Sequence, residues 1–489
     1  MKLAALSAAA GMTASAHADA VVTGFAIDHR KVAPGTIFGA FQGGRVNGED
    51  FIPAAIAAGA IAVVARPEAR VEGAAHLADP QPRRAFAHLA AQFFRPVPDT
   101  IVAVTGTNGK TSVAEMTRQI WRIAGFSAAS IGTLGVTTPD ESVSTGLTTP
   151  DIVTFLATMA GLSREGVTHV AYEASSHGLT QFRNEGLRVA AGAFTNLSRD
   201  HLDYHADMDD YFAAKMRLFG DVVDAGGTAV IWADVAWSDR ACDAAAARGL
   251  ALLRVGERGD GITLLARTPG HLGQTLQLRH AGQEYAVTLP LIGAYQAANA
   301  LVAAGLVIAT GGNAAAVFDA LGRLQPVRGR LERAAITATG APVYVDYAHT
   351  PDGLSAAIAA LRPHVAGRLI TVFGAGGDRD PGKRAPMGEA ALAGSDLVIV
   401  TDDNPRGEDP AVIRAAVLRG APGAQEIGDR RQAIAAAIAE AGSTDIVLIA
   451  GKGHEQGQIV GAGENLRVLP FDDVSVAREC AGQMAGMNP

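Results

Sequence analysis

Short runs of apolar residues alternate with longer amphipathic stretches along most of this chain. The runs are continuously apolar, which is typical of strands buried on both faces of a parallel sheet. They are followed by alanine-rich segments whose apolar residues recur at helical spacing. Strands are expected at 60–65, 101–104, 167–172, 189–194, 228–232, 342–346, 368–373, 396–401 and 445–449. Helices are expected at 113–124, 294–309, 352–361, 386–393, 410–418 and 430–441. This alternation predicts an α/β fold.

The alternation divides into three parts. A length of 489 residues suggests about three domains of ~150 residues each. Prolines mark 95–99 as a linker. Before it, a strand at 21–28 and a helix starting near 51–56 suggest a small unit. We therefore predict a small N-terminal α/β domain (1–98), a central P-loop ATPase domain with a mostly parallel sheet (99–327) and a C-terminal Rossmann-like domain (328–489).

Composition and charge exclude several classes of protein. The net charge is −8, so nothing favours a nucleic-acid partner. Cys242 and Cys480 are too few for a disulfide scaffold or a zinc cluster, and they fit a reducing compartment. The first 18 residues resemble a secretory signal, but glycine and hydroxyl residues interrupt the apolar stretch. With no apolar run long enough to span a bilayer, we expect a cytoplasmic protein without a membrane span.

The segment from Gly106 to Ser112 reads Gly-Thr-Asn-Gly-Lys-Thr-Ser between an apolar strand and a helix. A glycine-rich turn there points backbone N–H groups at an anion, and the helix dipole favours negative charge. Lys110 can reach the outer phosphates of a nucleotide, and the Thr111 hydroxyl can bind Mg²⁺. Val104 stands where the usual P-loop has its first glycine, so the motif is shortened. We expect a nucleotide site, the alternative being an ordinary strand-to-helix turn.

Ionisable side chains follow the two strands that end near residues 172 and 194. Ligands of open α/β sheets bind at that edge. Glu173 is expected to be a metal ligand beside the phosphate loop, the alternative being a helix-starting carboxylate. His201 is expected to bind a second metal or to position a phosphate, whereas His205 is more simply structural. Taken alone, Lys215 looks like a surface lysine on an amphipathic helix.

Four polar segments follow strands of the last domain: 346–352, 374–380, 402–406 and 451–455. The carboxyl ends of parallel strands meet at one edge, so these segments are expected to lie together. Arg379 and Arg406 can pair bidentately with carboxylates, and Glu455 can take an ammonium group. With Asn404 beside them, they predict a site for a zwitterionic amino acid rather than four solvated loops.

A magnesium–nucleotide site and an amino-acid site together favour ATP-driven attachment of the amino acid to a carboxylate. A carboxylate is a poor acceptor for an amine. Transfer of the γ-phosphate converts it to an acyl phosphate with a good leaving group. The protein would mainly position the reactants and neutralise charge.

Taken together, these motifs resemble the Mur ligases of peptidoglycan synthesis over nearly the whole chain. The segments that carry the resemblance are 106–112, 173–178, Thr195-Asn196 with Asp200-His201, 346–349 and 451–455. The closest likeness is to the branch that adds the third amino acid, at the D-glutamate carboxylate of UDP-N-acetylmuramoyl-L-alanyl-D-glutamate. The resemblance implies ATP as co-substrate, Mg²⁺ at two sites, small-molecule partners and a monomer.

The resemblance also implies residue roles. Lys110, His201 and Lys215 would be catalytic, with Lys215 carbamylated. Metal would be held by Thr111, Glu173, His201 and carbamylated Lys215. Nucleotide would be bound by Gly106, Thr107, Asn108, Gly109, Lys110, Thr111, Ser112, Asn299, Arg330, Asp346 and His349. The UDP-linked substrate would be bound by Asp28, Arg30, Thr148, Thr149, Ser175, Gln181 and Arg183, with the loop 43–48 also at the uridine end.

The same resemblance bears on which amino acid is added. Members that add meso-2,6-diaminopimelate carry an Asp-Asn-Pro-Arg stretch, and Asp403 to Arg406 reads the same. Diaminopimelate differs from lysine by a carboxylate on the distal carbon, which Arg406 can bind. Loss of that contact would cost a few kcal/mol, which is enough for strong discrimination. The implied pocket is Arg379, Asp403, Asn404, Pro405, Arg406, Gly451 and Glu455.

Two departures and three alternatives remain open. The loop from Gln42 to Gly48 differs slightly from the family's pattern. Asp28-His29-Arg30 replaces the Asp-Ser-Arg usual in the family, which leaves open the uridine-side contact made by serine. Arg406 argues against a lysine-adding ligase, and a whole N-terminal uridine-type domain argues against a folylpolyglutamate synthetase. A nucleotide-gated switch would need the phosphate loop but not the amino-acid edge.

Overall fold

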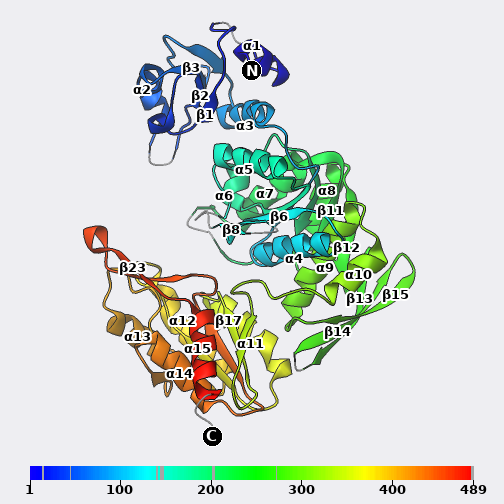
Figure 1. The fold of residues 1–489 in the computed structure, drawn as a ribbon, viewed down its shortest axis with the longest axis vertical. Coiled ribbons are helices and arrows are strands. Elements are labelled where there is room, and N and C mark those ends of the chain that lie inside the picture. The colour runs from blue at the N-terminus through cyan, green and yellow to red at the C-terminus, as the bar shows by residue number, and fades with distance from the viewer. Residues whose placement is uncertain are drawn as a thin grey trace. The chain divides into compact units, whose positions relative to one another are not determined.

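The computed structural model describes residues 1–13, 16–43, 46–138, 141–143, 148–200, 204–270 and 272–485. The chain groups into two compact units, Met1–Thr263 with Leu301–Val317, and Leu264–Ala300 with Phe318–Pro489 (Figure 1). Within the described ranges, none of the helices has the length and apolar character needed to cross a bilayer.

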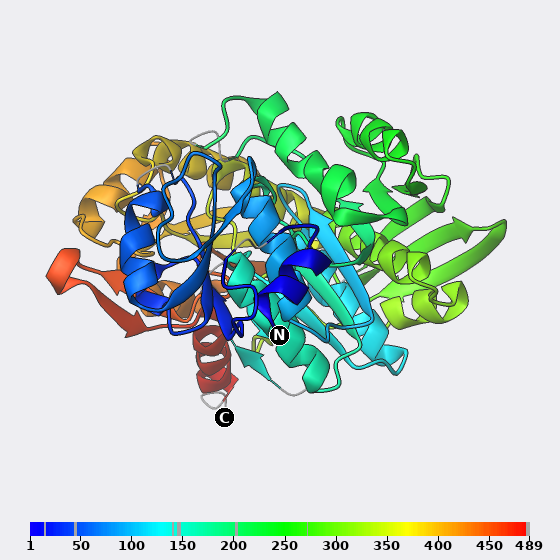
Figure 2. The same cartoon turned by 90° about the horizontal axis from the view of Figure 1, so that it is seen from above.

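The N-terminal part of the first unit is a small sheet with helices packed against it (Figure 2). Its strands pair in the order β1 (Gly24–Ala26), β2 (Thr36–Gly39), β3 (Ala60–Ala65) and β4 (Ala75–Ala78), and each pairing is parallel. Its helical segments are α1 (Leu3–Ala9), η1 (His29–Lys31), η2 (Gly48–Phe51), α2 (Ile52–Ala57) and α3 (Pro82–Phe93). The strand expected at 21–28 is shorter, because the Asp28 side chain caps η1 and turns the chain.

The alanine-rich N-terminal segment forms α1, which lies against α3. Leu3 and Leu6 are fully buried and belong to the same core cluster as Phe86 and Leu89 of α3. The segment that resembles a secretory signal therefore contributes side chains to the hydrophobic core of this part.

The main sheet of the first unit is built around β5 (Thr100–Thr105). The other strands are β6 (Ala128–Gly132), β7 (Gly135–Thr137), β8 (Ser142–Val143), β9 (His169–Glu173), β10 (Val189–Phe194), β11 (Val223–Trp232) and β12 (Ala251–Gly256). They pair in the order β12-β11-β10-β5-β9-β6-β7-β8. Pairing is parallel from β12 to β6 and antiparallel from β6 to β8. The expected mostly parallel sheet is confirmed.

Helices connect these strands. They are α4 (Lys110–Ile123), α5 (Ile152–Arg164), α6 (Ser176–Thr180), α7 (Met208–Arg217), the π-helical turn η3 (Leu218–Val222) and α8 (Ser238–Ala247). Further along the chain lie β13 (Ile262–Gly270), the antiparallel pair β14 (Gly273–His280) and β15 (Gln283–Leu289), and helices α9 (Ala294–Ala309) and α10 (Ala314–Leu321).

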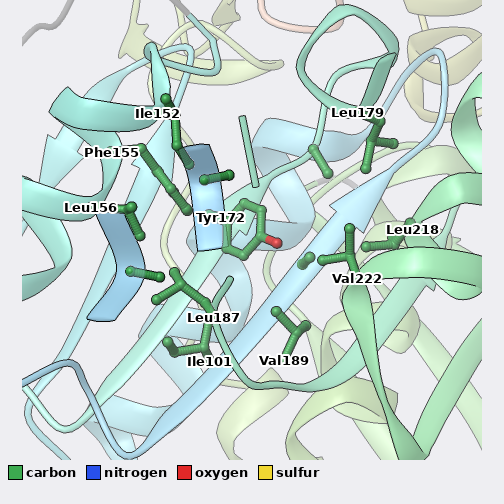
Figure 3. Close-up of a cluster of buried hydrophobic side chains, with 14 of the residues drawn as sticks. Ile101, Ile152, Phe155, Leu156, Tyr172, Leu179, Leu187, Val189, Leu218 and Val222 are labelled. Carbon is green, nitrogen blue, oxygen red and sulfur yellow. The ribbon is translucent and has the colours of Figure 1, made fainter. Parts of the chain in front are cut away.

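Tyr172 of β9 lies in the core of the first unit, among the apolar side chains drawn in Figure 3. No described residue is hydrogen-bonded to its hydroxyl, and burial raises the pKa of the phenol. Side chains alternate along a strand, so the next residue, Glu173, faces the other way. The core thereby fixes the register that presents Glu173 at the carboxyl end of β9.

The second unit contains its own sheet. Its strands pair in the order β16 (Glu332–Ile336), β17 (Pro342–Asp346), β21 (Ile446–Ala450), β18 (Leu369–Phe373), β19 (Leu397–Val400) and β20 (Gln425–Glu426). Pairing is parallel from β17 to β20, and β16 is antiparallel. Outside this sheet lie the antiparallel pair β22 (Gly457–Val460) and β23 (Arg467–Pro470) and the short turns η4 (Arg362–His364), η5 (Pro381–Lys383) and η6 (Gly463–Asn465).

Helices cover both faces of this second sheet. One face packs against α11 (Pro351–Leu361), α12 (Arg384–Gly394) and α13 (Pro410–Leu418). The other packs against α14 (Arg430–Glu440) and α15 (Asp473–Ala485). The expected doubly wound, Rossmann-like arrangement is confirmed.

Candidate functional site

The loop from Gly106 to Gly109 joins β5 to the first turn of α4. Gly109 caps the helix with φ +88°, and Gly106 has φ +143°. A Cβ at Gly106 would lie 1.9 Å from the Thr195 hydroxyl oxygen, so no larger residue fits. Lys110 Nζ donates to the carbonyl oxygens of Gly106 (3.0 Å) and Thr107 (2.8 Å). Helix α4 therefore starts at Lys110, three residues earlier than expected, with its N-terminus at the loop.

The strand on one side of β5 supplies the support for this loop. The Asn196 side chain after β10 accepts from the backbone N–H of Asn108 at 2.9 Å and donates to the Asn108 carbonyl at 3.2 Å. The Thr195 hydroxyl donates to the same carbonyl at 2.6 Å. Thr195 and Asn196 thus fix the backbone of the loop at Asn108.

Lys215 of α7 reaches the same loop. Its Nζ donates to the carbonyl oxygen of Gly106 at 2.7 Å and lies 4.3 Å from the centre of the Tyr211 ring. The side chain is only 1% exposed, so the surface position suggested by the helical pattern alone is wrong. Burial, and then the charge of Lys110, lowers the pKa of Lys215 well below its usual value.

The strand on the other side of β5 brings Glu173 to the site. Glu173 and Thr111 are buried and line one small pocket at the start of α4. The Glu173 carboxylate accepts from the backbone N–H of Thr133 at 2.6 Å and from its hydroxyl at 3.2 Å. A Cβ at Gly132 would lie 2.0 Å from a Glu173 oxygen, so glycine keeps that carboxylate in place. This buried hydroxyl–carboxylate pair fits Mg²⁺, which prefers oxygen ligands and keeps several waters.

His201, the other expected metal ligand, lies outside the described residues. In the part of the chain that is described, no three His, Cys, Asp or Glu side chains converge as a metal site would require.

Residues expected to hold the UDP-linked substrate form a hydrogen-bonded group at the carboxyl end of β9, where the Thr149 hydroxyl donates to the Glu173 carbonyl. The Thr149 hydroxyl lies 3.0 Å from the Ser175 hydroxyl, and Ser175 caps α6. Arg183 donates from Nη1 to the Thr149 carbonyl at 2.8 Å and from Nη2 to the Gln181 side chain at 2.7 Å. The Thr148 hydroxyl lies 3.1 Å from that of Thr133, the residue that holds Glu173. Through Thr148 and Thr133, this group is therefore connected to Glu173 and to the pocket at the start of α4.

At the expected uridine end, Asp28 and Arg30 pair with each other. The Arg30 Nη2 donates to Asp28 at 2.7 Å, and the hydrogen bonds from Arg30 lower the pKa of the Asp28 carboxyl to about 2. The His29 ring stacks on Phe51 with ring centres 4.4 Å apart. The position whose uridine-side contact the resemblance leaves open therefore makes an aromatic contact within this chain.

The remaining nucleotide residues form a cluster in the second unit. The Asn299 side chain donates to Gln296 at 3.4 Å, and Gln296 donates to the Arg330 carbonyl at 2.7 Å. The guanidinium group of Arg330 lies 4.7 Å from the centre of the Tyr347 ring. The centres of the Tyr347 and His349 rings lie 4.6 Å apart. A guanidinium group beside two aromatic rings can accommodate the base of a nucleotide.

Asp346 is buried at the end of β17 and anchors that cluster. Its carboxylate accepts from the backbone N–H groups of Leu331 (2.7 Å) and Ala348 (2.9 Å). Burial raises the pKa of Asp346 and lowers that of His349. Asp346 therefore fixes the backbone that carries Arg330 and His349.

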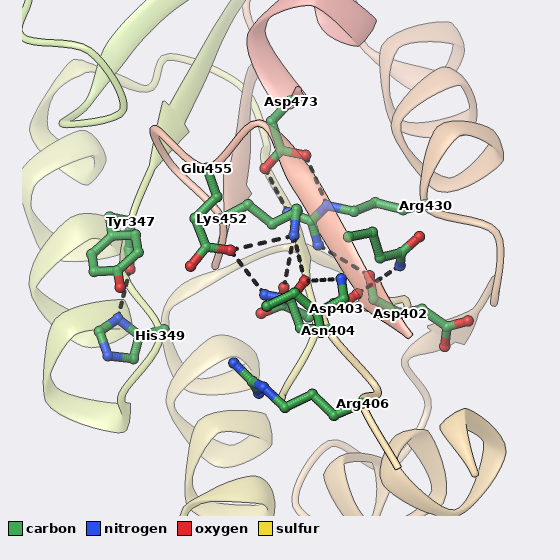
Figure 4. A network of polar contacts seen from close by, with 12 residues as sticks. Tyr347, His349, Asp402, Asp403, Asn404, Arg406, Arg430, Lys452, Glu455 and Asp473 are labelled. Carbon is green, nitrogen blue, oxygen red and sulfur yellow. Dashed lines mark hydrogen bonds and ion pairs between the residues drawn. The ribbon is translucent and has the colours of Figure 1, made fainter. Parts of the chain in front are cut away.

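The four polar loops expected on one sheet edge do meet there, because β17, β21, β18 and β19 are adjacent and parallel. Figure 4 shows the side chains. Asn404 donates from Nδ2 to Glu455 at 2.8 Å. Arg406 has φ +50° and donates from Nη1 to the Gly377 carbonyl at 2.8 Å. Pro405, Gly451 and Asp403 are buried around them, and Arg379 is exposed on the adjacent loop.

The sequence expectations give no role to two groups at or beneath this edge, although Lys452 lies within the expected segment 451–455. Lys452 is fully buried and donates from Nζ to Asn404 Oδ1 at 2.8 Å, with Glu455 at 3.4 Å and Asp403 at 3.5 Å (Figure 4). Lys452 is the second residue after β21, and this position at a strand end is the feature of the sequence from which its role could have been predicted. Asn404 and Lys452 both contact the same carboxylate oxygen of Glu455, Oε2.

The second missed group is the buried ion pair between Arg430 and Asp473, 2.6 Å apart and both inaccessible to solvent. Arg430 also donates to the carbonyls of Ala450 (3.0 Å) and Asp402 (3.3 Å), at the ends of β21 and β19. The pair therefore braces the loops that carry the amino-acid edge. Nothing in the local pattern of α14 marks Arg430 as buried.

Family models match three stretches of the chain. They are described as Mur ligase family, catalytic domain (21–94), Mur ligase middle domain (104–307), and Mur ligase, glutamate ligase domain (329–453).

Individual relatives agree. The UDP-N-acetylmuramoyl-L-alanyl-D-glutamate–2,6-diaminopimelate ligase of Zymomonas mobilis is 60% identical over 94% of this chain and 95% of its own length. The protein of the same name from Bradyrhizobium diazoefficiens is 53% identical over 95% and 96%. A solved structure of a ligase of that name matches with a TM-score of 0.72 at 34% identity, covering 94% and 95% of the two chains.

Proposed function

Because the chain belongs to the Mur ligase family, we propose that it is the ATP-dependent ligase that joins meso-2,6-diaminopimelate to the D-glutamate carboxylate of UDP-N-acetylmuramoyl-L-alanyl-D-glutamate, in peptidoglycan precursor synthesis. The observation that carries the choice of amino acid is the segment Asp403 to Arg406, held at the sheet edge in a chain 60% identical to a diaminopimelate ligase. A folylpolyglutamate synthase from Mycobacterium tuberculosis shares the fold at 21% identity. A likeness at that level concerns the fold alone and gives no reason to assign its reaction to this chain.

The first step takes place on the phosphate loop. Backbone N–H groups of the loop, the N-terminus of α4 and Lys110 bind the phosphates of ATP. The Thr149, Ser175 and Arg183 group holds the D-glutamate carboxylate for attack on the γ-phosphorus. A carboxylate oxygen bonds to phosphorus, the bond to the ADP leaving oxygen breaks, and an acyl phosphate results.

The second step consumes the amine. The neutral amine nitrogen of diaminopimelate attacks the acyl carbon. Inorganic phosphate leaves from the tetrahedral intermediate, and the proton that the nitrogen loses passes to the departing phosphate. Preorganised donors and excluded water favour this transfer over hydrolysis. When bound, Mg²⁺ supplies charge neutralisation at the phosphates, and Thr111, Glu173, His201 and carbamylated Lys215 are the residues we assign to hold it at two sites.

The amino-acid pocket is consistent with the charges of the ligand. Diaminopimelate carries two carboxylates and two ammonium groups. Arg406 and Arg379 are assigned to the carboxylates, and Glu455 and Asp403 to an ammonium. Lys452 holds Asn404 and Glu455 in one network, so the acidic oxygens are fixed before the ligand arrives.

The remaining assignments complete the proposal. Asn299, Arg330, Asp346 and His349 serve the nucleotide, and Asp28 and Arg30 serve the uridine end. We assign the boundaries 1–98, 99–327 and 328–489 to three domains, each of which contains one matched family model. We also propose a monomer that works in the cytoplasm, where ATP is available.

The test is phosphate release by purified protein with Mg–ATP and the UDP-linked dipeptide, with diaminopimelate or L-lysine supplied in parallel. The proposal expects turnover with diaminopimelate alone and a tripeptide product by mass. Turnover with lysine would keep the ligase and reject the amino-acid assignment. ATP binding without turnover on either would favour a nucleotide-gated switch.

A further inference from the structure

The segment from Asp403 to Arg406 lies beside β22, the first strand of the antiparallel pair outside the sheet. The Arg406 N–H donates to the Ile459 carbonyl at 3.0 Å, and the Gly461 N–H donates to the Arg406 carbonyl at 2.7 Å. The Ile459 N–H donates to Asn404 Oδ1 at 2.9 Å. Backbone groups of β22 and of the residue after it therefore hold both Asn404 and Arg406, two of the residues assigned to the amino acid.

Arg406 needs this support because of its own backbone. Its φ of +50° lies in the left-handed region, which residues with a Cβ rarely adopt and which persists only where the surroundings hold it. With the backbone held in this way, the guanidinium group reaches the Gly377 carbonyl at 2.8 Å. The direction of the Arg406 side chain therefore depends on the pairing of its backbone with β22.

A side chain of β22 contacts the same segment. Gln458 donates from Nε2 to the Asp403 carbonyl at 2.6 Å. The Asp403 carboxylate lies 3.5 Å from the ammonium nitrogen of Lys452. Asp403 is thus held through its side chain by Lys452 and through its backbone by Gln458, at the start of the segment that ends at Arg406.

The pair formed by β22 and β23 has little apolar packing of its own. All four residues of β22 are half-buried, and all four of β23 are exposed. A two-stranded pair without a packed face is marginally stable in water. The polar contacts that tie β22 to the segment 403–406 therefore stabilise the strand and the segment together, and Gln458 supplies one of them from a side chain.

We propose that Gln458 is a positioning residue for the choice of amino acid. It holds the Asp403 carbonyl against β22, and this contact keeps the segment 403–406 in place and Arg406 in its left-handed conformation. Gln458 is assigned no contact with the ligand and acts through Arg406. The inference rests on the proposed function for the identity of the amino acid, whereas the hold on the segment requires no ligand.

The kinetic test compares the wild type with Gln458→Met, which keeps the length of the side chain but removes the donor. Loss of one hydrogen bond predicts a KM for diaminopimelate raised roughly 3- to 10-fold and a preference over lysine reduced by a similar factor. The KM values for ATP and the UDP-linked dipeptide are expected to change less than about twofold. Gln456→Met alters an exposed glutamine two residues earlier and should leave all of these quantities unchanged.

A double variant tests whether Gln458 acts through Arg406. Once the Arg406 side chain is absent, its positioning no longer matters, so Arg406→Ala with Gln458→Met should discriminate against lysine no less than Arg406→Ala alone. Losses of preference that multiply in the double variant would contradict the inference, because they would show that the two residues act independently.

Hydrogen exchange gives a readout that needs no substrate. Mass spectrometry of peptides that cover 403–407 should show faster exchange in Gln458→Met than in the wild type or Gln456→Met, because loosening of β22 frees the Arg406 N–H. Unchanged exchange would overturn the inference. Equal rises in all three KM values with a lower melting temperature would also overturn it, because they would indicate a general loss of structure.

The two measurements together separate this inference from the proposed function. Wild-type turnover with diaminopimelate and an unchanged preference in Gln458→Met reject the inference alone. Faster exchange in Gln458→Met without wild-type turnover supports the hold on the segment 403–406 and rejects the ligase.

Discussion

The ammonium group of Lys215 donates a hydrogen bond to the carbonyl oxygen of Gly106, 2.7 Å away, although 109 residues separate them in sequence. Burial and the charge of Lys110 lower the pKa of Lys215, which favours the neutral amine. The neutral amine is the form that adds to CO₂, releasing a proton and leaving a carbamate. The buried position therefore favours the form of Lys215 that the proposed carbamylation requires.

Replacing Lys215 tests this role. Lys215→Arg keeps a cation but cannot form the carbamate, and we expect ligation to fall by on the order of 10³-fold, because several kcal/mol of charge stabilisation would be lost. Carbon-13 NMR with labelled bicarbonate should show a carbamate signal in the wild type that is missing from the variant. Full activity in Lys215→Arg would rule the carbamate out.

Arg406→Ala tests the amino-acid pocket. Loss of the contact to the distal carboxylate should raise the KM for diaminopimelate roughly 100-fold and reduce its advantage over lysine, with the KM for ATP nearly unchanged. Steady-state kinetics with each substrate varied in turn measures this. Arg419→Ala, which removes an exposed arginine of the same unit, is the control. Undiminished preference for diaminopimelate in Arg406→Ala would place the specificity elsewhere.

Asp473→Asn tests the buried brace under the amino-acid edge. The change leaves the Arg430 charge without its counter-ion, which should cost about 3–5 kcal/mol of stability and lower the melting temperature. The KM for diaminopimelate should also rise, because Arg430 holds the Asp402 and Ala450 carbonyls. Glu479→Gln breaks the exposed pair with Arg431 and should change neither quantity. Equal melting temperatures for the two variants would contradict the role of the buried pair.

His454 provides a test by pH. Burial, followed by the charges of Arg330, Arg328 and His349, lowers its pKa to about 4. Since the unfolded chain has the higher pKa, it binds more protons below pH ~6.5, so protonation favours unfolding. The stability that depends on the neutral His454 ring is fully present above that pH. As the pH falls towards 4, the free energy of unfolding decreases by no more than about 3 kcal/mol.

NMR titration of the His454 ring, assigned with His454→Gln, measures this pKa directly. Arg328→Ala removes one of the neighbouring positive charges and should raise it. A wild-type value near 6.5 would show that the ring is not in the environment described.

The strand-end argument located the polar sheet edge of the second unit because the local sequence marks where each strand ends. Continuous apolar runs identified β17, β18, β19 and β21, and parallel strands place their following loops at one edge. The same argument placed Glu173 at the end of β9. These predictions needed no knowledge of which helix packs where.

The predictions that failed depended on contacts between distant segments. The pattern of α7 suggested a surface lysine, yet Lys215 is buried because α7 packs against the phosphate loop. The Arg430–Asp473 pair joins residues 43 positions apart, and nothing in either helix alone marks them as buried. Lys452 could have been found from its place after β21. His201 lies outside the described residues, so its role stays a prediction.

The most direct test of the central claim follows an oxygen atom. The UDP-linked dipeptide is labelled with oxygen-18 in the reacting D-glutamate carboxylate and incubated with the protein, Mg–ATP and diaminopimelate. Mass spectrometry then measures the oxygen-18 content of the released phosphate and of the tripeptide product. The account predicts one labelled oxygen in the released phosphate for each tripeptide formed, because that oxygen attacks the γ-phosphorus and leaves with it. Unlabelled phosphate, or phosphate released without tripeptide, would contradict ligation through an acyl phosphate.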